Sequence, residues 1–274
     1  MSQHWEWLRF GGIRSRDYDV WISGANVWSA PERDVEVVEI PGRNGTLSLD
    51  NGRYKNVSIV YPCYMSGNFN TDFDTFKVAM LSKTGYLRLS DTYHPDHFRM
   101  ARLTGGFKPK PGPYNRSAKF DLTFDCYPQL FLRSGDTAVT ITSTETMENP
   151  TPFATRPQLI IGFTPDVGTI QPKSGTVSIV TTDGGMIPIT TTQTITFTNI
   201  PFTTAQEQQR GIVIDCKTGT IQRRDTYENL SAYAQLTTGD FFELPGKSVT
   251  AQSFDVSFTG DVSRILLTPR WWTL

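Results

Sequence analysis

The sequence has 274 residues, of which 38% are hydrophobic and 19% charged, and its formal net charge is −1. This length suggests one large or two ordinary domains. The near-neutral charge gives no basic field for nucleic acid, and no apolar run approaches the length of a membrane span. The N-terminus lacks the basic start and apolar core of an export signal.

The cysteines and the β-branched residues narrow the class of protein further. Cys63, Cys126 and Cys216 lie far apart, each in a strand-like run. An odd number without local pairing argues against a disulfide framework and for synthesis in a reducing compartment. The abundance of threonine favours strands over helices, so we expect a mainly β protein.

Residues 28–64 carry the strongest local pattern in the chain. An apolar run at 35–40 leads into Pro-Gly and Asn-Gly turn dipeptides, and Asn-Gly is the strongest short hairpin signal. Residues 46–49 alternate polar and apolar, Asp-Asn-Gly at 50–52 predicts a second turn, and a third strand follows. Such a polar hairpin is either a solvated projection or an arm that docks on another subunit. Its candidate interface residues are Arg43, Asn44, Asp50, Asn51, Arg53 and Tyr54.

One helix is predicted, over residues 71–83. Thr71 is a suitable N-cap, and Phe73, Phe76 and Met80 form an apolar stripe that should lie on a sheet face. Gly85 fits the left-handed position that follows a helix.

The second half of the chain changes character. A clean alternating strand at 118–127 is followed by a predicted boundary near 134–136, which gives domains at 1–133 and 134–274. Short strands then recur about every ten residues, the pattern of a sandwich or barrel. The candidate strands are 138–142, 158–163, 176–181, 194–198, 211–215, 220–222, 253–258 and 264–268.

Few residues suggest chemistry. His94 and His97 flank a proline in DTYHPDH, which favours a loop of solvated polar residues over a metal site. The cysteines alternate with apolar residues and should be inert, and Asp240 and Glu243 fit a turn and a strand start better than a catalytic pair. Nucleophile-elbow and phosphate-loop motifs are absent from the sequence. We expect no enzyme, cofactor or metal.

With these motifs in place, the chain resembles the distal tail protein family of long, non-contractile-tailed phages of Gram-positive bacteria. The N-terminal match covers about half the chain, and the C-terminal half matches more loosely. The motifs are DYDV at 17–20, ISG at 22–24, APERDVE at 30–36, IPGRNG at 40–45, DNGRYKN at 50–56, DCYPQLFLRSG from Asp125, IDCKTG at 214–219, GDFFELPG at 239–246 and TPRWW at 268–272.

The resemblance implies a two-domain structural protein of the virion tail tip, made in the host cytoplasm. The N-terminal domain would be β-sandwich-like, with one helix and a projecting hairpin arm, and six copies would close into a ring. The C-terminal domain would be a galectin-like or carbohydrate-binding-module-like β-sandwich. The ring would join the tail tube to the tail-associated fibre or lysin protein, next to the tape-measure protein and receptor-binding proteins, without contacting nucleic acid or membrane.

Three alternatives accompany this interpretation. The C-terminal sandwich could be a carbohydrate-binding module that contacts the host surface, with Tyr227, Tyr233 and Phe241 as candidate sugar contacts. A cell-wall hydrolase is the weakest alternative. Trp271-Trp272 could stack on sugar, although anchoring of the last strand is favoured. Residues 264–274 could close the C-terminal sandwich or return to the N-terminal domain. Because the resemblance rests most heavily on residues 28–64, we expect the hairpin to dock.

Overall fold

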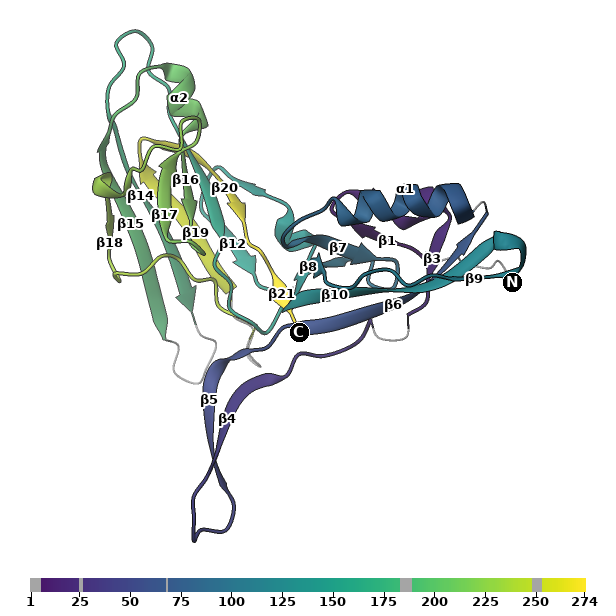
Figure 1. The fold of residues 1–274 in the computed structure, drawn as a ribbon. Helices are drawn as coiled ribbons and strands as arrows, with labels where there is room; N and C mark the ends of the chain where they lie inside the picture. The colour runs from purple at the N-terminus through teal and green to yellow at the C-terminus, as the bar shows by residue number, and fades with distance from the viewer. Residues whose placement is uncertain (1–5, 25–26, 68, 183–188, 248–252) are drawn as a thin grey trace. The chain divides into compact units, whose positions relative to one another are not determined.

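The computed structural model describes residues 6–24, 27–67, 69–182, 189–247 and 253–274 (Figure 1). The chain divides into two compact units, Met1–Leu130 with Leu274, and Phe131–Thr273. We call them the N-terminal and C-terminal units. Both are built mainly from β-strands, as predicted. Domains at 1–133 and 134–274 stay a prediction. Among the described helices, none combines the length and the apolar character needed to cross a membrane.

The N-terminal unit is organised around one sheet with the strand order β2-β1-β7-β8-β10-β6-β3, and β9 also pairs with β10. Its two longest strands, β6 and β10, are antiparallel neighbours. The strands are β1 (Leu8–Phe10), β2 (Ile13–Arg14), β3 (Val20–Ile22), β6 (Val57–Ser66), β7 (Leu87–Asp91), β8 (His97–Leu103), β9 (Lys110–Pro111) and β10 (Ser117–Leu132). Short 3₁₀ turns lie at Ser15–Tyr18 and Pro113–Asn115.

The pairing of β6 with β10 sets the inner face of this sheet. Its register runs from Val57↔Cys126 at one end to Ser66↔Ser117 at the other. Because side chains alternate across a strand, every second residue of both strands enters the core. The predicted inner face of β10, Phe120 to Cys126 in steps of two, is buried as expected.

Helix α1 (Phe69–Leu81) is confirmed, but its predicted start at Thr71 is wrong. Thr71 lies inside the helix, where its carbonyl accepts a hydrogen bond from the Thr75 hydroxyl at 3.1 Å. The apolar stripe is correct, since Phe76 and Met80 are fully buried in the core of the unit. Gly85 has φ +74°, the left-handed conformation predicted for it.

The predicted hairpin consists of β4 (Arg33–Glu39) and β5 (Thr46–Tyr54), which form a separate two-stranded sheet (Figure 1). The predicted second turn at residues 50–52 is wrong, because β5 continues through it. The register shifts there from Val35↔Asp50 to Arg33↔Tyr54, and Gly52 has φ +71°. The Asp-Asn-Gly sequence therefore makes a bulge. The third predicted strand, β6, pairs with β10 and β3 and not with the hairpin.

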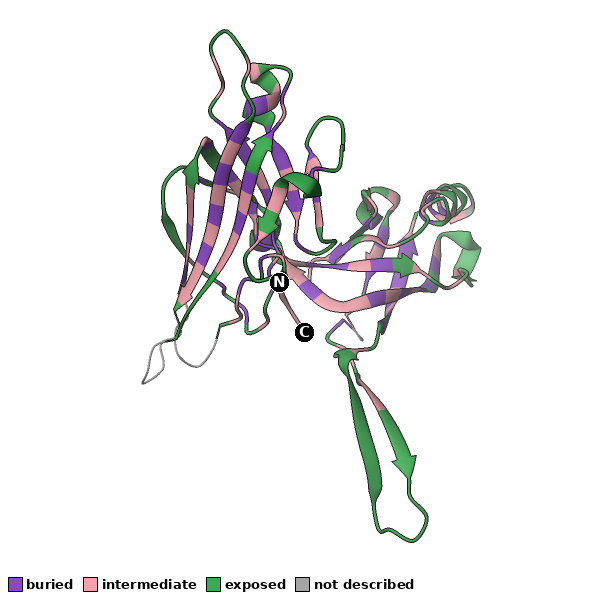
Figure 2. Ribbon diagram, turned by 90° about the vertical axis from the view of Figure 1, so that its left-hand side faces the viewer, coloured by how far each residue is buried: buried purple, intermediate pink, exposed green. Residues whose placement is uncertain are grey.

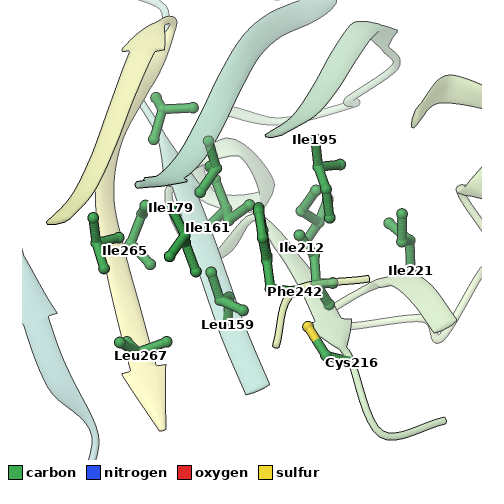
Figure 3. Close-up of a cluster of buried hydrophobic side chains, with 14 of the residues drawn as sticks. Leu159, Ile161, Ile179, Ile195, Ile212, Cys216, Ile221, Phe242, Ile265 and Leu267 are labelled. Carbon is green, nitrogen blue, oxygen red and sulfur yellow. The ribbon is translucent and has the colours of Figure 1, made fainter. Parts of the chain in front are cut away.

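The C-terminal unit contains two five-stranded antiparallel sheets, with orders β11-β20-β13-β16-β17 and β12-β19-β14-β15-β18. All eight predicted strands are present. The strands are β11 (Val139–Ile141), β12 (Glu145–Glu148), β13 (Gln158–Phe163), β14 (Lys173–Thr182), β15 (Thr190–Ile200), β16 (Ile212–Asp215), β17 (Thr220–Arg223), β18 (Ala234–Leu236), β19 (Ser253–Gly260) and β20 (Val262–Thr268). Their alternating inner residues form one core between the sheets, in which Leu159 and Ile265 face Ile179 and Ile195 (Figure 3).

Three elements of this unit were missed from the sequence: β12, β18 and the short helix α2 (Ala205–Arg210). Thr204 caps α2, because its hydroxyl accepts a hydrogen bond from the Glu207 backbone N–H at 3.1 Å. The Glu207 carboxylate accepts in turn from the backbone and hydroxyl of Thr203, each at 2.8 Å. A Thr-x-x-Glu capping box was therefore visible in the sequence.

The end of the chain belongs mostly to the C-terminal unit, which contains residues 131–273, whereas Leu274 groups with the N-terminal unit. Strand β20 lies between β11 and β13. Trp271 is buried, with its ring 6.3 Å from Phe254. Trp272 stacks on Phe153 at 4.4 Å and donates from Nε1 to the Ala154 carbonyl. The tryptophan pair thus anchors the terminus, as favoured. A final strand, β21, spans Trp272–Thr273 and pairs with β10, so it belongs to neither five-stranded sheet, and each of the two placements left open is correct in part.

Candidate interaction sites

The arm, defined here as residues 33–54, is the most exposed regular structure described in the N-terminal unit. Almost every residue of β4 and β5 is exposed (Figure 2). Arg43 and Asn44 lie in the connecting turn, which is closed by a hydrogen bond from the Arg43 N–H to the Ile40 carbonyl. Gly42 and Gly45 supply the positive φ angles of that turn.

Two ion pairs cross the base of the arm. Arg33 contacts Asp50 at 2.9 Å, and Arg53 contacts Asp34 at 2.7 Å. The hydrogen bond from Arg53 lowers the pKa of Asp34. The Arg33 guanidinium also lies 4.9 Å from the centre of the Tyr54 ring. Three of the candidate interface residues, Asp50, Arg53 and Tyr54, are thus engaged inside the arm.

One face of the arm is apolar. The register pairs Val38 with Leu47 and Glu36 with Leu49, so these side chains share a face. Val38 is 37% exposed, Leu47 42% and Leu49 47%, and Ile40 at the turn is 37% exposed. Large apolar side chains grouped on an exposed ribbon mark an interaction surface. Sequence reasoning missed this face because it selected the polar residues of the turns.

The three candidate sugar contacts do not form one site. Tyr227 is 74% exposed in the loop after β17, and Tyr233 is 37% exposed in a short 3₁₀ turn. Phe241 is half-buried and packs against the core. It also lines an open pocket of about 410 Å³ to which neither tyrosine contributes.

This pocket collects polar side chains from four separate segments of the C-terminal unit. Its volume falls in the range of small-molecule sites. Arg156 pairs with Glu243 at 3.4 Å, and Gln193 makes two hydrogen bonds to the Glu243 backbone. Lys217 and Asp240 complete a lining with equal numbers of positive and negative groups. The predicted strand start at this position is wrong, since Asp240 lies in a bend and only an isolated bridge joins Leu244 to Thr155.

The histidine loop is less solvated than predicted. His94 is half-buried, and its backbone N–H and Nδ1 lie 2.9 and 3.3 Å from one Asp91 oxygen. The other Asp91 oxygen accepts from the buried Tyr61 hydroxyl at 2.6 Å. Burial lowers the pKa of His97, and the neighbouring His94 and Arg99 act in the same direction. No cluster of three or more His, Cys, Asp or Glu suited to a metal ion occurs in the described part of the chain.

The cysteines are buried and unpaired. Burial raises the pKa of Cys126 and of Cys216 to about 12, and it raises the pKa of Cys63 as well. The thiolate is the nucleophilic form, so these thiols are unreactive at neutral pH, as predicted.

The fold of the chain is the one found in proteins of phage baseplates and hub adsorption apparatus. The Dit protein of SPP1 is described as a paradigm of the hub adsorption apparatus in phages that infect Gram-positive bacteria. Its crystal structure matches with a TM-score of 0.64 and 14% identity, over 96% of this chain and 97% of that one. A chain of the phage p2 baseplate, in its activated conformation with Sr, matches with a TM-score of 0.51 and 11% identity, over 96% of both chains.

The likeness concerns the fold, and it confirms the resemblance seen in the sequence at that level. No protein-family model and no curated protein matches the sequence.

Proposed function

We propose that this chain is a structural hub of a phage tail tip and not an enzyme. The observation that carries the proposal is the shared fold with the SPP1 hub protein over nearly the whole of both chains. The exposed arm supports it independently, because monomeric proteins rarely expose grouped apolar side chains such as those of the arm.

Six copies form the ring through their N-terminal units. A closed ring uses one heterologous interface repeated around an axis. The arm suits such an interface, since a two-stranded ribbon offers a free edge and an apolar face to the next copy. Arg43 and Asn44 at its turn, together with Asp50, Asn51, Arg53 and Tyr54, remain the proposed contact residues, to which we add the apolar face.

The ring lies at the virion tail tip, between the tail tube and the tail-associated fibre or lysin protein. The tape-measure protein and receptor-binding proteins are its other partners. The C-terminal unit is a galectin-like sandwich at the periphery of the ring. These assignments rest on the shared fold and on the sequence resemblance.

The test is the oligomeric state of the purified chain and of a variant in which residues 43–54 are replaced by a short turn. We expect wild type to form rings visible by negative-stain electron microscopy, and the variant to be a folded monomer of lower mass. Light scattering that gives only the 30.8-kDa monomer at high concentration, without rings, contradicts the hub. Rings of the variant would place the interface outside the arm.

A second candidate function is saccharide binding by the C-terminal unit. The pocket at Phe241 favours it, because a neutral balance of charged groups, several threonine hydroxyls and one aromatic ring suits a polar, uncharged ligand. A cell-wall pull-down with the full chain and with Phe241→Ala tests it. Equal retention of both proteins, or retention of neither, removes this function and leaves the hub unaffected.

A further inference from the structure

Residues 108–119, which we call the tip, carry an unusual charge for this chain. They comprise the end of a loop, β9, a 3₁₀ turn and the start of β10. The segment holds four cations and no acidic residue, and since the whole chain carries −1, the rest of it carries −5. The cations are Lys108, Lys110, Arg116 and Lys119. All four are exposed, and none has an ion-pair partner in the described part of the chain.

The strand pairing places two of these charges against each other. Lys110 is the direct cross-strand partner of Lys119. Like charges directly opposite in an antiparallel pair destabilise it. The tip thus bears an electrostatic cost that an acidic partner would relieve.

An aromatic side chain stands at the end of the tip. Tyr114 is 94% exposed and has φ +56°, and the next residue, Asn115, has φ +52°. A non-glycine residue in this left-handed region is strained, and tyrosine at such a position is uncommon. Three prolines, Pro109, Pro111 and Pro113, stiffen the segment that presents it. Tyrosine and arginine are the side chains that most often dominate the binding energy of an interface.

The tip and the arm are attached at opposite ends of the same strand pair. The arm enters β6 at Val57, which pairs with Cys126, whereas the tip adjoins the other end, where Ser66 pairs with Ser117. Ten paired residues at the usual rise separate these ends by about 30 Å. Two complementary surfaces at opposite ends of one unit favour head-to-tail contact between copies.

The arm contains acidic residues, which the tip lacks, although its turn also carries the cation Arg43. Its two internal ion pairs neutralise Arg33, Asp34, Asp50 and Arg53. Glu36 and Glu39 of β4 remain exposed, with no ion-pair partner in the described residues. They lie three residues apart and so point to opposite faces of the arm, and Glu36 shares its face with Leu49. Among the described strands β4 pairs only with β5, so its outer edge is free. Val38, Leu47 and Leu49 share a face with Glu36 and offer an apolar surface on which the Tyr114 ring can pack.

We propose that the tip of one copy binds the outer edge of β4 in the arm of the next copy. The side chains of Lys110 and Lys119, which share one face of the tip, pair with Glu36, and Tyr114 packs beside it on the apolar face of the arm. This inference rests on the proposed ring and names the surface on which the arm docks.

A charge swap tests the pairing in the full-length chain. K110E/K119E should weaken self-association about tenfold or more in sedimentation velocity at low salt, and E36K should weaken it as well. The two sets combined in one chain should restore it. R224E/K247E is the matched control, because it makes the same change in net charge as K110E/K119E at exposed residues of the C-terminal unit that lie outside the pocket.

Tyr114→Gly separates binding from folding. Glycine accepts the left-handed backbone without strain, so the midpoint of thermal unfolding should equal or exceed that of wild type while association weakens. Tyr227→Gly is the control, since Tyr227 is 74% exposed and has φ +57°. It should gain the same stability without loss of association.

The outcomes separate this inference from the ring itself. Rings that withstand K110E/K119E, or a charge swap that fails to restore association, overturn the inference and leave the hub standing. A wild-type chain that stays monomeric removes the hub and the inference together. If a DNA oligonucleotide binds wild type but not K110E/K119E, while association is unchanged, the tip is a nucleic-acid contact and the inference is wrong.

Discussion

Replacing the apolar face of the arm with hydroxyl groups should dissolve the ring without unfolding the chain. Leu47→Ser/Leu49→Ser removes the two leucines of this face, which are 42% and 47% exposed. Because both side chains already stand in water, the free energy of unfolding should change by no more than about 0.5 kcal/mol for each substitution.

The effect on association follows from the surface still exposed. Full burial of a leucine side chain contributes about 1.5–3 kcal/mol, and docking would bury the roughly half that remains in water, about 1 kcal/mol for each leucine. The double variant therefore loses about 2 kcal/mol per contact, or about 30-fold in the dissociation constant. Sedimentation velocity over a concentration series measures this loss.

A matched variant at exposed apolar residues outside the arm makes the test specific. Val78 and Leu81 on α1 are 65% and 52% exposed, so Val78→Ser/Leu81→Ser removes a similar apolar area outside the arm. We expect this variant to associate like wild type. If the helix variant dissociates while the arm variant forms rings, the reasoning is refuted and the interface lies over α1.

Three further predictions concern stability. Burial lowers the pKa of His97 below 6.5, so the unfolded chain binds the proton more readily than the folded chain does. The stability that neutral His97 contributes should be full above pH 6.5 and fall as the pH drops below it. His97→Gln should flatten this pH dependence in denaturant titrations. Gly211→Ala should lower the free energy of unfolding by more than about 2 kcal/mol, because φ is +69° and a Cβ would overlap the Ile161 carbonyl; a smaller loss in urea titrations would show that the α2–β16 junction relaxes. Asp166 has its pKa lowered from 3.8 to about 2, first by the hydrogen bond from Lys173, so it contributes stability above pH 3.8 that is lost between pH 3.8 and 2; Asp166→Asn should abolish that loss in thermal melts.

Elements with a strong period were predictable from the sequence, and elements defined by a single local signal were less so. The stripe of Phe76 and Met80 located α1, and the alternation at 118–127 located β10. Helix α2 has six residues, too few for a period to show, so only its capping box could have revealed it. Asp50-Asn51-Gly52 was misread because the sequence that makes a turn also makes a bulge, and strand pairing alone decides between them.

The pocket of the C-terminal unit could not be predicted, since its lining comes from segments far apart in the chain. Arg156 and Glu243 are 87 residues apart, and Gln193 reaches Glu243 across 50. Aromatic character led to Tyr227 and Tyr233, which lie outside the pocket, and to Phe241, which lines it. Residue type alone therefore locates one of the three.

The arm shows how strand register changes the meaning of a charged sequence. In the sequence, Asp50 and Arg53 are polar turn residues available to a neighbour; in the fold, the bulge at Gly52 brings them opposite Arg33 and Asp34, which satisfy them. The same register sets Glu36 beside Leu49 on the exposed apolar face, and no cation of the described residues pairs with it. A side chain that is already ion-paired within the arm must leave its partner before it can pair with a neighbouring copy, so it adds little to binding. An unpaired carboxylate beside an apolar surface gains a cation without losing one, and the apolar surface packs in the same contact. The surface that docks should therefore centre on β4 and the leucines of β5.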